Sequence, residues 1–182
     1  MKNFKFSRLF VAALVVACLA LTGCKPQTEE VLVEKIIVAR PIASTDKIIG
    51  SWISTYGEKY EVSSSEFKNY YGTSECYTGD NVYVAETSET SGYIYFKYTK
   101  AFCYAHSDFD NFVYTYDDDA PDVGKWYALY YSDLTDSSVK ISGAAGEKSS
   151  CDTLKEAIET FTVANGYMST ITDGKYSACT KE

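Results

Sequence analysis

Tyr93-Ile94-Tyr95-Phe96-Lys97-Tyr98-Thr99 decides the fold of this chain, because bulky side chains alternate along it with a period of two. In a strand this period places Ile94, Phe96 and Tyr98 on one face and the intervening residues on the other. The same alternation recurs in residues 81–85, 125–131 and 139–141. Clusters of Gly, Ser, Asn and Asp separate these short runs. We therefore expect an all-β domain, an antiparallel meander that closes into a small barrel.

One segment near the C-terminus breaks the two-residue period. Four apolar side chains follow the helical spacing i, i+3, i+4 and i+7: Leu154, Ala157, Ile158 and Phe161. This spacing predicts a helix within residues 152–161 that buries one face. Asn165-Gly166 supplies a stop signal, and residues 167–172 are expected to form a short final strand.

The first 23 residues have the features of a bacterial export signal. Lys2, Lys5 and Arg8 precede an apolar run, residues 9–20, whose helix would be about 18 Å long, against a hydrocarbon core of about 30 Å. A permanent transmembrane anchor is therefore the weaker alternative. The next residues, Leu21-Thr22-Gly23-Cys24, resemble a bacterial lipobox. This resemblance implies that the Cys24 thiol receives a diacylglyceryl group through a thioether, that the chain is cleaved before Cys24, and that the new amino group is acylated. Fatty acyl chains such as palmitate then anchor the protein to a membrane.

The residues after Cys24 bear on the destination and charge of the anchored protein. Lys25 stands where an Asp would favour retention at the inner membrane, so the resemblance implies the outer membrane or cell surface. Loss of residues 1–23 removes three of the 17 basic residues and none of the 25 acidic ones, leaving a net charge of −11. So acidic a protein is a poor partner for nucleic acid.

The chain divides into the signal (residues 1–23), a tether (residues 24–46) and the β-domain (residues 47–182). Pro26 and Pro41 bracket the tether. Its apolar clusters within residues 29–40 fit a short helix or an edge strand, and we expect this segment to dock on the domain or on a partner.

Four cysteines remain in the β-domain: Cys76, Cys103, Cys151 and Cys179. An even number in an exported protein indicates two disulfides, with free buried thiols as the alternative. If residues 76–86 and 93–103 form a hairpin, Cys76 lies opposite Cys103. The helix runs away from Cys151 and the following chain runs back, so we expect a second bridge between Cys151 and Cys179.

Gly50-Ser51-Trp52 opens the predicted barrel and resembles the Gly-x-Trp signature of lipocalins. That resemblance implies an eight-stranded barrel that binds a small apolar ligand in its mouth. The family's arginine over the tryptophan is absent, and Lys140 is the nearest candidate to replace it. Candidate ligand-binding residues are Trp52, Tyr95, Tyr98, Trp126 and Tyr130, although dense packing by tyrosine and a core position for Trp52 are the favoured alternatives.

An acidic loop follows the central strands. It contains Asp108, Asp110, Asp117, Asp118, Asp119 and Asp122, together with His106 and Asn111. Such oxygens suit calcium, but the EF-hand spacing is missing, so we expect a solvated loop without metal. The single His and the lack of nucleophile, zinc-protease, P-loop or Rossmann motifs indicate a protein that is not an enzyme and needs no cofactor.

The sequence therefore predicts a membrane-anchored lipoprotein with a non-catalytic domain that binds a small hydrophobic ligand. The alternative is a surface that binds another protein, as in adhesion to a host protein or inhibition of an envelope-directed lysozyme. The acidic domain suits a basic lysozyme through electrostatic steering. A sealed barrel would favour this alternative.

Overall fold

A computed structural model of the chain describes residues 38–168, 174 and 176–182. The strands are β1 (Arg40–Pro41), β2 (Gly50–Ser54), β3 (Glu58–Val62), β4 (Glu66–Tyr71), β5 (Ser74–Glu86), β6 (Gly92–Phe102), β7 (Tyr116–Asp117), β8 (Trp126–Ser132), β9 (Ser138–Gly143) and β10 (Ser177–Lys181); the helix α2 spans Leu154–Thr160. Export signal, lipobox and most of the tether lie outside the described residues. No helix in the described part is long and apolar enough to cross a membrane.

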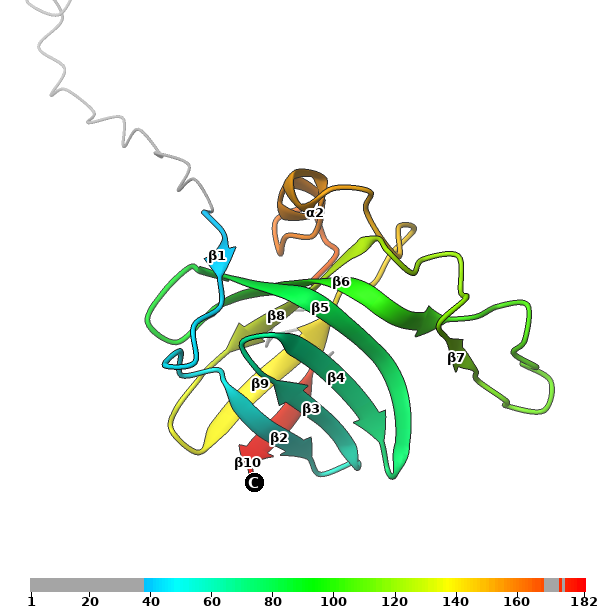
Figure 1. Cartoon of the computed structure of the whole chain (residues 1–182). Helices are drawn as coiled ribbons and strands as arrows, with labels where there is room; N and C mark the ends of the chain where they lie inside the picture. Colours follow the sequence, from blue (N-terminus) through cyan, green and yellow to red (C-terminus); the bar gives the residue numbers. More distant parts are fainter. Residues whose placement is uncertain (1–37, 169–173, 175) are drawn as a thin grey trace, which may run out of the picture. The chain divides into compact units, whose positions relative to one another are not determined.

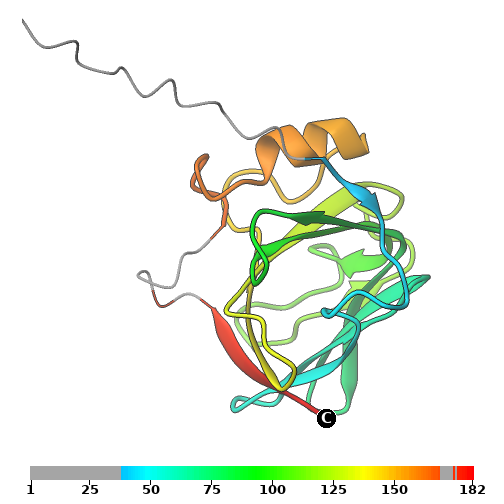
Figure 2. The same cartoon turned by 90° about the vertical axis from the view of Figure 1, so that its left-hand side faces the viewer.

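Eight of these strands close into an antiparallel barrel. Their order is β5-β4-β3-β2-β10-β9-β8-β6, and β6 pairs with β5 to complete the ring. The last strand, β10, pairs with β2, the first strand of the barrel, with Lys181 opposite Trp52 and Cys179 opposite Ser54. Figures 1 and 2 show the closed wall, with α2 outside it. The expected small all-β barrel with a C-terminal helix and a short final strand is thus confirmed.

The two-residue period sorts side chains between the inside and the outside of the barrel. Ile94, Phe96 and Tyr98 of β6 belong to the interior cluster. Tyr93 and Tyr95 of the same strand belong to a second cluster outside the wall. Strands β5, β6 and β8 thus contribute to two apolar layers, one on each side of the wall.

Helix α2 covers the outer cluster as its apolar spacing predicts. Ala157 and, just past the helix, Phe161 are both fully buried against it. The helix begins after Thr153, whose hydroxyl accepts a hydrogen bond from the backbone N–H of Glu156. The final strand is β10, which starts at Ser177. The final strand expected from the sequence, residues 167–172, starts ten residues earlier. Of that segment, Met168 makes an isolated bridge to Ala144, and residues 169–172 lie outside the described part.

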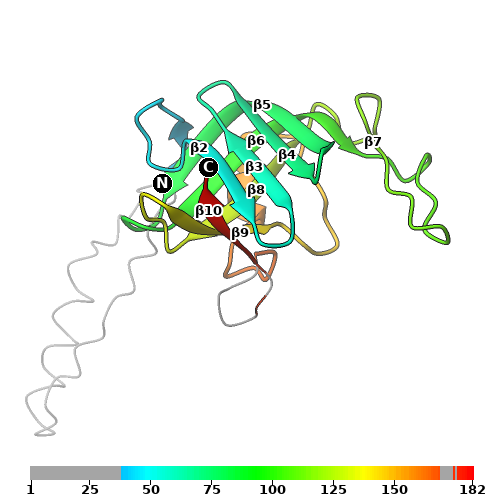
Figure 3. The same ribbon diagram turned by 90° about the horizontal axis from the view of Figure 1, so that it is seen from below.

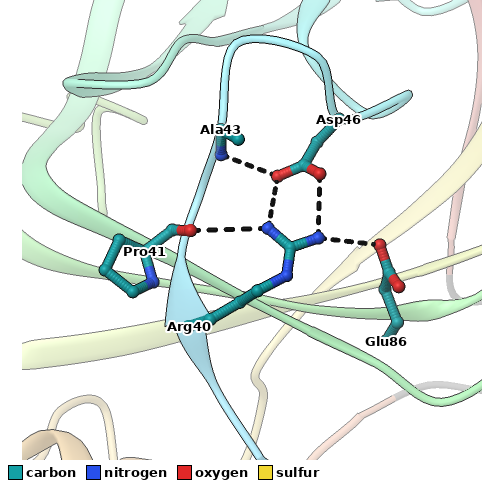
Figure 4. Close-up of polar contacts among 5 residues, drawn as sticks. All are labelled: Arg40, Pro41, Ala43, Asp46 and Glu86. Carbon is teal, nitrogen blue, oxygen red and sulfur yellow. Dashed lines mark hydrogen bonds and ion pairs between the residues drawn. The ribbon is translucent and has the colours of Figure 1, made fainter.

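The end of the predicted tether docks on the barrel through β1. β1 pairs with β5, placing Arg40 opposite Val84, and Ile42 is buried. The Arg40 guanidinium forms two hydrogen bonds of 2.8 Å with the carboxylate of Asp46 and one of 3.1 Å with Glu86 (Figure 4). Hydrogen bonding from Arg40 lowers the pKa of Asp46. Residues 40–42, which belong to the tether predicted from the sequence, thus contact the barrel.

Candidate functional site

The centre of the barrel is filled with aromatic rings. Phe67 stacks on Phe96 with 4.3 Å between ring centroids, and Tyr98 stacks on Tyr127 at 5.2 Å. Trp52, Phe67 and Phe96 have no exposed surface at all. A side chain with no accessible surface borders no space that could hold even a water molecule. These three residues therefore leave no room for a ligand beside them.

A pocket of about 320 Å³ lies near the docked β1 segment. Its lining contains the charged side chains of Asp46, Lys47, Glu86 and Glu89 together with Ile48, Tyr131 and Leu134. Burial of these charges under an apolar molecule would be costly. This pocket is a poor match for the small hydrophobic ligand that the lipocalin resemblance implies.

The five candidate ligand-binding residues do not form one site. Trp52 and Tyr98 lie inside the barrel. Tyr95, Trp126 and Tyr130 lie in or against the cluster outside the wall. Odd and even positions of a strand face opposite sides, so Tyr95 and Tyr98 of β6 belong to different layers. The ring of Trp52 is covered by Lys181, whose Nζ lies 4.9 Å from the ring centroid, whereas Lys140 lies over Tyr176. Lys181 therefore holds the place expected for Lys140.

Neither of the expected disulfides is formed. The four cysteines are free and buried. β5 and β6 pair Thr78 with Lys100, so the same register continued by two residues would set Cys76 against Phe102 rather than Cys103. A shift of one residue moves a side chain to the other face of the sheet. Cys179 belongs to the interior cluster and Cys151 to the outer one, so the barrel wall also separates the second expected pair.

The most exposed aromatic surface lies on the segment between β6 and β7. We call residues 103–115 the aromatic arm; Figures 1 and 3 show it extending beyond the barrel wall. Half-buried Phe102 is the hub at its base, with ring centroids 4.6 Å from Tyr104, 6.0 Å from Phe109 and 6.3 Å from Tyr114. The rings pack against one another and keep one side open to solvent.

The tip of the arm is a tight turn that holds a phenylalanine outward. The backbones of Asp108 and Val113 exchange two hydrogen bonds of 2.8 and 2.7 Å, and the Asp108 carboxylate accepts from the N–H groups of Asp110 and Asn111. Phe112 has a φ of +56°, a left-handed conformation that costs about 1–2 kcal/mol for a residue with a side chain. It is 79% exposed. Strained residues of this kind cluster at functional sites.

The arm is acidic and is closed at its base by polar contacts. Residues 101–124 contain six Asp and no Lys or Arg. His106 Nδ1 lies 3.0 Å from Asp117 Oδ2, and this hydrogen bond lowers the pKa of Asp117. Ser107 donates to the carbonyl of Cys103 at 2.9 Å and accepts from the N–H of Thr115 at 2.9 Å. These contacts link the outgoing and returning segments of the arm at its base.

Comparisons with known proteins give no relative: no family model, curated protein or solved structure matches this chain. The candidate site therefore stands on its geometry. The acidic residues of the loop stood out in the sequence, but its exposed rings did not. Tyr104, Phe109, Phe112 and Tyr114 show no regular period, and only their neighbouring turn residues, Asp110-Asn111, could have indicated that they are exposed.

Proposed function

We propose that this chain is an exported lipoprotein, anchored through Cys24 at the outer membrane or cell surface, whose aromatic arm binds a basic protein. One observation carries the proposal. Among the described residues, eight large apolar side chains are exposed, and five of them lie in the arm: Tyr104, Phe109, Phe112, Val113 and Tyr114. Exposed rings gathered in one place are typical of protein-binding surfaces.

The charge of the arm specifies the kind of partner. Asp108 and Asp110 flank Phe109 at the tip, and Asp117, Asp118 and Asp119 follow at the base. A protein with basic groups around an apolar pocket would complement both features. An anionic membrane surface would repel the same arm, so direct insertion into lipid is disfavoured.

A non-catalytic role in binding a small hydrophobic molecule has less support. It would require space among rings that are in close contact at the centre of the barrel. Such a role predicts loss of binding on substitution of Trp52, whereas the arm proposal predicts loss on substitution of Phe112 and its neighbours.

A basic lysozyme is the first probe, because it carries the expected charge and acts on the bacterial envelope. Binding would be measured by titration calorimetry with the detergent-solubilised chain, and inhibition by lysis of cell-wall suspensions. Phe112→Ala combined with Tyr114→Ala is expected to weaken binding at least about tenfold, since central aromatic residues contribute about 2 kcal/mol or more each.

The matched control is Tyr56→Ala combined with Tyr71→Ala. These tyrosines are 80% and 65% exposed, but they lie outside the arm. The control variant should bind like the wild type. Equal loss in both variants, or co-purification of an organic-extractable ligand whose binding depends on Trp52, would contradict the proposal.

A further inference from the structure

Four side chains of different chemistry converge at the base of the arm. They are Cys103, His106, Asp117 and Asp119, and one ligand atom of each lies within 4.8 Å of all the others. Cys103 and His106 come from the outgoing chain after β6, whereas Asp117 belongs to β7 and Asp119 follows it. The group therefore spans the two ends of the arm.

Local backbone structure brings these residues together. The N–H of Ser107 donates to the carbonyl of Cys103 at 3.1 Å, which closes one turn and places Cys103 and His106 three residues apart on one side of it. On the returning chain, Phe102 opposite Tyr116 and Ala101 opposite Asp117 fix the register of β7. The hydrogen bonds through Ser107 and Thr115 hold the two sides in this alignment.

The donor set selects among metals. A thiolate and an imidazole are poor ligands for calcium and magnesium, which take oxygen, but they are preferred by zinc. Tetrahedral zinc with bonds of about 2.0–2.3 Å spaces its ligand atoms by about 3.3–3.8 Å. The ligand atoms, which lie within 4.8 Å of one another, would have to approach by about 1 Å to reach that range.

Access and burial also suit a bound ion. Cys103 is only 3% exposed, whereas the side chain of His106 is 53% exposed. Asp117 also lines a solvent-facing pocket of about 410 Å³. A site with one buried sulfur and an open outer side has both a strong ligand and an entry path.

We propose that Cys103, His106, Asp117 and Asp119 form a zinc(II) site that fastens the base of the aromatic arm. Binding releases the thiol proton of Cys103 and places the ion between the outgoing and returning chains. This site goes beyond the proposed protein binding and does not depend on it.

The test is titration of the full chain, purified in detergent under reducing conditions and stripped of metal, with zinc chloride alone. We expect one ion per chain with micromolar or tighter affinity. His106→Gln and Asp119→Asn, at exposed positions that should not affect folding, should each weaken binding at least tenfold. Asp110→Asn and Asp118→Asn, from the same acidic loop but outside the four, should change it less than twofold.

Cobalt(II) gives a second readout that does not depend on affinity. A thiolate-to-cobalt charge-transfer band and tetrahedral d–d bands are expected. Both should be lost in Cys103→Ser and retained in Cys76→Ser, because the thiol of Cys76 faces the carbonyl of Ser74. The proposal is overturned if zinc binding is non-stoichiometric, if His106→Gln binds like the wild type, or if cobalt shows no sulfur ligand. A Cys76–Cys103 disulfide in the non-reduced protein would overturn it as well.

Discussion

The hydroxyl of Tyr95 is the one buried side-chain polar atom in the described part that has no hydrogen-bond partner. The ring is fully buried outside the barrel wall, where burial raises the pKa of the phenol. A buried polar group without a partner costs about 1–3 kcal/mol relative to one that is satisfied. Its neighbour Tyr93 differs, since its hydroxyl accepts from the N–H of Val163 at 3.1 Å.

Tyr95→Phe is expected to stabilise the domain by about 1 kcal/mol, because it removes the unpaired oxygen and keeps the ring. Urea denaturation followed by tryptophan fluorescence measures the change. Tyr93→Phe is the matched control. It should destabilise the domain by about 1 kcal/mol, since it leaves the N–H of Val163 without a hydrogen-bond partner. Equal effects of the two substitutions would show that the Tyr95 hydroxyl has a partner in solution.

Strands β5 and β6 depend on the absence of a side chain at Gly79. An added Cβ would lie 2.3 Å from Cδ2 of Phe96 and 2.7 Å from the carbonyl oxygen of Lys97. Phe96 contacts Phe67 and Tyr127, with 4.3 and 5.7 Å between ring centroids, so moving it aside would disturb two further ring contacts. The register of the two strands shifts immediately beside this glycine, between Thr78 and Gly79.

Gly79→Ala is expected to destabilise the barrel by about 1–3 kcal/mol through overpacking. The unfolding midpoint in urea measures this loss. A smaller partner should relieve it, so the same substitution introduced into Phe96→Leu should cost clearly less. An undiminished cost in that background would place the strain in the backbone rather than against the ring.

Sequence periodicity predicted the elements well and their alignment less well. Alternation along residues 93–99 separated Tyr95 from Tyr98 correctly, because the face of a strand is a local property. The residue opposite Cys76 depends on the bulges and the turn between β5 and β6. A register that differs by one residue from the expected one removes the expected pairing of Cys76 with Cys103. The rings of the arm follow no regular period. Their clustering, and the proximity of Cys103 and Asp117 at the base of the arm, could therefore be recognised only in the folded structure.

Across the molecule, negative charge and exposed rings coincide on one projection. The tip carries Asp108 and Asp110 beside Phe109 and Phe112, with no basic residue in the arm. Steering by such a surface acts mainly on the association rate and is screened over about 8 Å at physiological ionic strength.

The association rate with a basic lysozyme is therefore expected to fall at least about tenfold between 20 and 300 mM salt. Stopped-flow fluorescence measures it. Asp108→Asn with Asp110→Asn should flatten this dependence, whereas Asp136→Asn, an exposed acid in the loop between β8 and β9, should not. An association rate that does not change with salt would contradict electrostatic steering by the arm.

The pairing of β2 with β10 also sets when this protein can fold. Trp52 finds its neighbour Lys181 only after the 128 residues between them have been synthesised. Until then β2 and β9 are open edges, and the longest-range contacts are also the slowest to form. The barrel wall therefore stays open between β2 and β9 until β10 has been synthesised.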